Sequence, residues 1–222
     1  PVDGSRRVYS ITSPATVTAP TGLNFTGITP IAMTLNWTDS PDETAYGIYL
    51  STDGTNYTFK GRAAQDATSF NAVNLLPSQN YFWRVFAVNE GRLSTALTGT
   101  QATQTPGAKS CNGAGGDWNT AATWSPAGVP TNTDDVTIGS GCTITVDTTT
   151  AVALDVFVQS GGTLTYIATP ASTLTVGLNI IVNAGGTISG PATGTGITHV
   201  VSVAGDLTNN GTLDLSTNGN TA

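Results

Sequence analysis

His199 is the only histidine in the chain, which makes it the first residue to consider as a catalytic base. A Ser-His-Asp triad needs a histidine that is oriented by an acid and lies beside an activated serine. The sequence has no Gly-x-Ser-x-Gly motif, which would present such a serine on a sharp turn. We therefore interpret His199, within residues 197–201, as a surface or ladder position on a strand.

Asp134 and Asp135 are the best candidates for paired carboxylates, because they are adjacent. Neighbouring residues of a strand point to opposite faces, so both can face one ligand only where the backbone is irregular. A turn-capping role, in which one carboxylate accepts backbone N–H groups, is the favoured interpretation. Calcium binding by Asp134 and Asp135 is the weaker alternative. A glycosidase pair is weaker still, because it needs two carboxyl groups across one cleft.

The second half of the chain carries no positive side chain. All seven Lys and Arg residues fall within residues 1–109, whereas residues 110–222 hold seven acidic residues and neither Lys nor Arg. A polysaccharide lyase abstracts a proton with a basic residue, so that activity is disfavoured. A surface without cations cannot neutralise phosphates, which argues against nucleic-acid partners. We expect no catalytic residues, no membrane insertion and no cofactor, with Ca²⁺ as the one candidate ion.

Two cysteines and two tryptophans lie in this acidic half. Cys111 and Cys142 have no histidine or further cysteine near them that would complete a metal site. A disulfide between them is favoured over two free thiols, and it would suit an exported protein. Trp118 and Trp124 are expected to plug one end of the domain; an aromatic platform for carbohydrate is the alternative.

Residues 20–105 alternate between short apolar runs and turn signals, a pattern typical of a β-sandwich. Residues 32–37 and 81–88 alternate in polarity, and Asp53-Gly54 is a hairpin signal between the runs 46–50 and 57–59. Four segments resemble a fibronectin type III domain: 20–23 at the entry, 35–37, 47–49, and 76–89. The resemblance assigns Trp37 to the core and assigns Leu76 and Tyr81 to the family's tyrosine corner. It implies a spacer or binding module.

Residues 110–222 contain a repeat that reads strand, Gly turn, strand. Its apolar marker residues are 20, 24 and 25 positions apart: Ile144, Leu164, Ile188 and Leu213. This period predicts one coil of a parallel β-helix per copy, with Val, Ile and Leu inward and Thr and Asn ladders outside. The expected fold is therefore all-β. It comprises the end of a preceding sandwich at 1–17, a fibronectin type III domain at 18–106, and right-handed β-helix coils at 110–222. We expect the coils to continue beyond the chain.

The segment 116–138 resembles the entry of β-helical repeats in large cell-surface proteins of Bacteroidota, which include adhesion and gliding proteins exported by type IX secretion. The resemblance implies an extracellular or cell-surface location, and it makes Thr148, in Asp147-Thr148-Thr149, a candidate O-glycosylation site.

Together these features predict a structural or adhesive segment of a secreted modular protein, either a stalk or a component of an extracellular filament. Its expected partners are other surface proteins, glycans or further copies of itself. The alternative is a non-catalytic accessory region of an extracellular carbohydrate-active enzyme.

Overall fold

The structure is a computed structural model, and it describes residues 16–191, 193 and 197–215. The chain divides into two compact units, residues 1–104 and 105–222. Among the described residues the regular elements are strands, apart from one 3-10 turn, η1 (Ala121–Thr123). The predicted all-β class is therefore confirmed. The segment 1–17, predicted to end a preceding domain, lies outside the described residues except for Thr16 and Val17, and Val17 packs against the core of the first unit.

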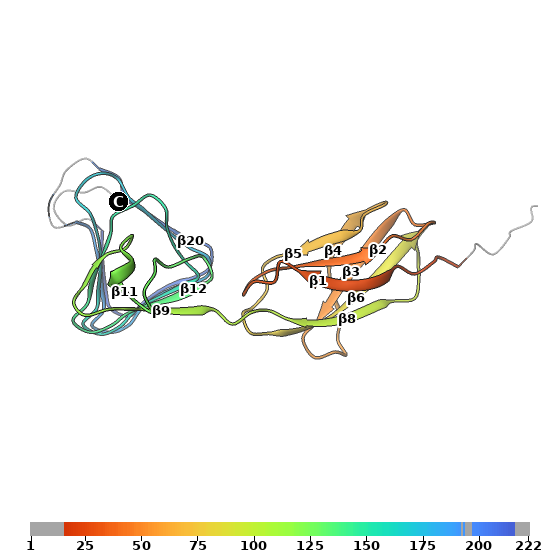
Figure 1. Cartoon of the computed structure of the whole chain (residues 1–222), viewed down its shortest axis with the longest axis horizontal. Helices are drawn as coiled ribbons and strands as arrows, with labels where there is room; N and C mark the ends of the chain where they lie inside the picture. The colour runs from red at the N-terminus through yellow and green to blue at the C-terminus, as the bar shows by residue number, and fades with distance from the viewer. Residues whose placement is uncertain (1–15, 192, 194–196, 216–222) are drawn as a thin grey trace, which may run out of the picture. The chain divides into compact units, whose positions relative to one another are not determined.

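The first unit is a sandwich of two antiparallel sheets (Figure 1). One sheet has the order β1-β2-β5; the other has the order β4-β3-β6-β7, and β8 also pairs with β6. The alternation predicted from sequence is present, because Met33 and Leu35 on β2 and Trp83 and Val85 on β6 are fully buried. The strands are β1 (Thr21–Thr26), β2 (Met33–Thr38), β3 (Ala45–Ser51), β4 (Thr58–Ala64), β5 (Ser69–Ala72), β6 (Asn80–Asn89), β7 (Arg92–Leu93) and β8 (Leu97–Ala102).

A tyrosine corner closes this sandwich, with one correction to the sequence-based assignment. The Tyr81 hydroxyl accepts a hydrogen bond from the backbone N–H of Leu76 at 2.8 Å. The leucine whose side chain enters the core is Leu75, however, which is 3% exposed, whereas Leu76 is 62% exposed. Leu76 thus contributes its backbone to the corner and Leu75 contributes the apolar side chain.

The second unit is a parallel β-solenoid. Its successive coils stack on one another and contribute their strands to three sheets. Successive coils nearly overlie one another in Figure 1, drawn from green to blue. The sheet orders are β11-β9-β12-β15-β18-β21, β10-β13-β16-β19-β22 and β14-β17-β20. The strands are β9 (Gly107–Cys111), β10 (Gly115–Asp117), β11 (Trp124–Ser125), β12 (Asp134–Ile138), β13 (Thr143–Val146), β14 (Ala151–Ala153), β15 (Asp155–Val158), β16 (Thr163–Tyr166), β17 (Thr173–Val176), β18 (Ile180–Val182), β19 (Thr187–Ser189), β20 (Val200–Val203), β21 (Leu207–Asn209) and β22 (Thr212–Asp214).

The register of the coils is the one that the repeat predicts. Ile144, Leu164, Ile188 and Leu213 pair in sequence along one sheet. Parallel pairing in register stacks identical inward positions, so each coil buries the apolar side chains of the next. The first three of these residues are at most 1% exposed. The third sheet, β14-β17-β20, was not predicted.

Glycine fixes the corner between the first two faces of three successive coils. Gly141, Gly161 and Gly185 have φ values of 76°, 75° and 81°, in the left-handed region that other residues avoid. Their backbones also bond from coil to coil: the Gly141 N–H donates to the Gly161 carbonyl at 2.9 Å, and the Gly161 N–H donates to the Gly185 carbonyl at 2.8 Å. A side chain at this corner would therefore disturb two coils.

We expect Gly161→Ala to lower the free energy of unfolding of the solenoid by about 1–2 kcal/mol, because a Cβ is strained at positive φ. The new atom would also lie 2.8 Å from the Ser140 hydroxyl. Denaturant titration followed by circular dichroism measures the effect. Gly139→Ala is the matched control, because a Cβ there meets nothing within 4 Å. Equal losses in the two variants would contradict the assigned role of the Gly161 corner.

Candidate functional site

His199 contacts a serine, yet the pair lacks the layout of a triad. The Ser172 hydroxyl lies 3.0 Å from His199 Nδ1, and the Ser172 backbone N–H also donates to that nitrogen at 3.2 Å. Ser172 is 1% exposed, so its hydroxyl cannot reach a substrate. Among the described residues no hydrogen-bond partner faces the buried His199 Nε2, where an orienting acid would lie. His199 precedes β20 and does not lie on that strand, and its ring packs at 5.3 Å from the Tyr166 ring.

Asp134 and Asp135 have separate roles in the structure. Asp134 caps a turn, because its Oδ2 accepts the backbone N–H and the hydroxyl of Thr131, each at 2.7 Å. This arrangement matches the turn-capping interpretation. Asp135 instead lies beside Asp155 of the next coil, in the paired register of β12 and β15. Calcium binding by the two residues stays a prediction.

Asp135 begins a row of polar side chains that runs along the solenoid. The row continues through Asp155 and Asn179 to Asp206. In the middle of the row each side chain accepts the backbone N–H of the following coil: Asn179 N–H donates to Asp155 Oδ1 at 2.8 Å, and Asp206 N–H donates to Asn179 Oδ1 at 3.0 Å. Such bonds fix the spacing between coils at this corner, so the row has a structural role.

Asp135 is the member of this row whose hydrogen bonding is incomplete. Its Oδ1 is buried and has no hydrogen-bond partner among the described residues. Burial, followed by the negative charge of Asp155, raises the pKa of Asp135 to about 6. A carboxyl group with a raised pKa binds its proton more tightly in the folded than in the unfolded state.

The contribution of Asp135 to stability should therefore be largest below about pH 4 and be lost as the pH rises through about 6. We expect Asp135→Asn to raise the free energy of unfolding at pH 7 by about 1 kcal/mol, a figure reduced for solvent screening of a half-buried group. The slope of stability between pH 4 and 6 should flatten. Denaturant titrations across that range measure it, with Asp206→Asn, at the exposed end of the row, as the control. If the unfolding free energy of Asp135→Asn depended on pH between 4 and 6 as strongly as that of the wild type, Asp135 would not be the source of this dependence.

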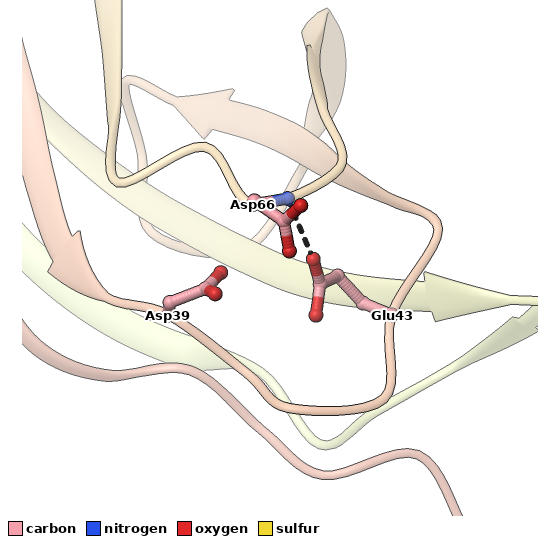
Figure 2. Close-up of side chains that lie close together, drawn as sticks. All are labelled: Asp39, Glu43 and Asp66. Atoms are coloured by element: carbon pink, nitrogen blue, oxygen red, sulfur yellow. Dashed lines mark hydrogen bonds between the residues drawn. The ribbon is translucent and has the colours of Figure 1, made fainter.

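A second group of carboxylates, unpredicted from sequence, lies on the first unit (Figure 2). Asp39 and Glu43, from the loop between β2 and β3, and Asp66, from the loop between β4 and β5, point toward one another, and one ligand atom of each lies within 4.8 Å of the others. Glu43 Oε1 accepts the backbone N–H of Asp66 at 2.8 Å, and Asp39 Oδ1 accepts the Tyr46 hydroxyl at 2.6 Å. Glu43 is 4% exposed. These bonds explain the grouping as a junction between loops, although its oxygens are also of the type that a hard cation takes.

Trp118 and Trp124 lie inside the solenoid, as the plug interpretation predicts. They are 0% and 1% exposed, and their rings meet edge to face at 5.1 Å. Neither ring is available as a carbohydrate platform. Cys111 and Cys142 form the predicted disulfide beside them and belong to the same apolar core.

Comparison with known proteins agrees with the sandwich geometry. The family model of the fibronectin type III domain matches residues 18–100. The first unit is a fibronectin type III domain. Residues 110–219 match the family described as a domain of unknown function, DUF8693. No curated protein matches the chain.

Solved fibronectin type III structures are similar to part of the chain. The domain of human collagen XX is 28% identical over 42% of this chain and 100% of its own length, with a TM-score of 0.36. A two-domain segment of chicken tenascin is 22% identical over 42% of this chain and 54% of its own, with a TM-score of 0.39.

The fibronectin type III domain and the solenoid are module types that are typically non-catalytic. Within residues 16–191, 193 and 197–215, no helix is long and apolar enough to cross a membrane. Thr148 lies in the turn between β13 and β14, and its hydroxyl lies 3.0 Å from that of Thr150. Its O-glycosylation stays a prediction.

Proposed function

We propose that this chain is a structural and adhesive segment of a secreted, modular cell-surface protein, in which the fibronectin type III domain is a spacer and the solenoid is part of a stalk or filament. The observation that carries the proposal is the unbroken parallel pairing of β12, β15, β18 and β21, flanked by two further sheets of the same kind. Each added coil pairs its backbone with the coil before it, so the stack lengthens without a flexible joint between its coils.

One feature supports an extracellular setting, and a second bears on the partners. The disulfide joins β9 to the first glycine corner of the solenoid, and such bonds persist in oxidising compartments. The acidic half of the chain has no Lys or Arg, so its surface favours neither nucleic acid nor anionic lipid. On this proposal the partners are other surface proteins, glycans or further copies, bound through many weak contacts that multivalency strengthens.

The finer assignment, to Bacteroidota surface proteins exported by type IX secretion, rests on the sequence resemblance at residues 116–138.

The proposal is tested on intact source cells. Protease added outside should remove the epitopes of this chain, while a cytoplasmic marker survives, and an antibody to the chain should label unpermeabilised cells. Epitopes that are lost only after lysis would overturn the cell-surface assignment. Polysaccharide cleavage that copurifies with the chain and depends on a neighbouring domain would instead support an accessory region of an enzyme.

A further inference from the structure

One face of the solenoid carries an ordered array of threonines, here called the threonine face. It is the outer surface of β13, β16, β19 and β22. Thr143, Thr163, Thr187 and Thr212 form one row in paired register, and Thr145, Thr165 and Ser189 form a second row two residues further along each strand. Asp117 and Asp214 stand at the two ends of the second row.

The array has two fixed repeats. Paired strands lie about 4.7–4.9 Å apart, and positions i and i+2 of one strand lie about 6.6–6.8 Å apart. The hydroxyl and methyl groups therefore form a two-dimensional lattice on a surface with little room to deform, because Ile144, Leu164 and Ile188 beneath it are at most 1% exposed. Threonine is stiff at χ1, so its two groups keep their orientation.

Hydrogen bonds further order the second row. The Thr165 hydroxyl donates to the Gly190 carbonyl at 3.1 Å, and the Ser189 hydroxyl lies 3.4 Å from the Thr165 hydroxyl. Thr143 and Thr212 at the ends of the first row are exposed, and the five residues between the ends are half-buried by their neighbours in the rows.

Strand propensity alone does not explain this face. If threonine were present only because it favours strands, the outer positions of the other sheets would be equally uniform. They are mixed: the outward row of β12, β15, β18 and β21 contains Thr137, Phe157, Ile181 and Thr208.

The chemistry of the array restricts the classes of ligand that it can bind. It contains no charge between its two terminal aspartates and no aromatic ring, so neither ion pairing nor stacking on sugar rings is available. What remains is a neutral, ordered lattice of hydroxyls and methyls over a packed core, which is complementary to a ligand that is itself a lattice of hydrogen-bonding oxygens. The prism plane of hexagonal ice is such a lattice, with a rectangular repeat of comparable dimensions.

We propose that the threonine face adsorbs to ice. Ordered water held between the methyl groups and hydrogen-bonded to the hydroxyls would join the crystal surface, and many such contacts on one rigid plane act together. This binding goes beyond the proposed stalk function and does not depend on it, since the isolated chain carries the face.

The test uses the purified full chain. A solution of the chain is frozen slowly onto an ice surface, and the partition of the chain between ice and liquid is measured. Inhibition of ice recrystallisation is followed separately by microscopy. Thr163→Tyr and Thr187→Tyr, which interrupt the lattice at its centre, should lower both effects at least tenfold. Thr175→Tyr, on the exposed side of β17 in another sheet, is the matched control and should retain them.

Circular dichroism and denaturant titration establish that each variant folds. Thr163→Val, which keeps the methyl group and replaces the hydroxyl with a second methyl, should give a smaller loss than Thr163→Tyr. Wild-type protein that is excluded from ice as completely as an inert globular protein would overturn the proposal. An equal loss in Thr175→Tyr would overturn it as well, and so would retention on crystalline cellulose or chitin without any effect on ice.

Discussion

Replacing Trp124 with alanine is expected to lower the free energy of unfolding of the solenoid by about 3–5 kcal/mol, the range for a buried aromatic side chain. Trp124 is 1% exposed and packs edge to face on Trp118 at the entry of the solenoid. Its indole Nε1 also donates to the Trp118 carbonyl at 2.8 Å. The substitution removes packing and leaves a buried acceptor without that donor.

Hydrogen exchange detected by mass spectrometry resolves the effect by segment. Protection should fall first in β9 to β13 and should not change in the fibronectin type III domain. Trp124→Phe keeps a ring but removes the indole N–H, so it should cost only about 1–2 kcal/mol. If Trp124→Ala retained wild-type protection in β9 to β13, the plug role of the two tryptophans would be wrong.

Breaking the disulfide should cost the solenoid about 3–4 kcal/mol, because the bond closes a loop of about 30 residues in the unfolded chain. Cys111 pairs with Trp124 across β9 and β11, and Cys142 is 3% exposed in the core. The bond therefore ties the entry strand to the first glycine corner. Reduced wild-type protein and the variant Cys111→Ala/Cys142→Ala should unfold at similarly lowered denaturant concentrations.

Intact-mass measurement with and without reductant verifies that the bond is present and then broken. The fibronectin type III domain provides the internal control, because it contains no cysteine. Reduction that leaves the unfolding of the solenoid unchanged would show that the bond does not constrain it.

The sequence was most informative where a short period is repeated without interruption. Strands such as β2 and β6 alternate over six and ten residues, so their buried faces follow directly from polarity. The Gly turns aligned the coils, and the pairing of Ile144 with Leu164 and Ile188 follows that alignment.

The third sheet of the solenoid escaped prediction for a physical reason. β14 has only three residues, Ala151–Ala153, and small side chains give little contrast in polarity. The turns that precede β14, β17 and β20 also differ in length, which hides their common period.

Sites formed by residues that are distant in the sequence could not be predicted from local patterns either. Glu43 meets Asp66 through a backbone N–H, and Asp66 adopts φ 58°, which no local sequence pattern demands. The tyrosine corner was found, but adjacent leucines left the buried one ambiguous: Leu75 enters the core and Leu76 faces solvent. Only three-dimensional packing separates two neighbours of the same type.

The central claim, that this chain is part of an extracellular stalk or filament, is tested most directly by electron microscopy of native material shed from the cell surface and labelled with an antibody to the chain. Labelled rods or fibres are the predicted result, with the label at a reproducible distance from one end. Labelled compact particles, above all particles that release sugars from polysaccharide, would contradict it.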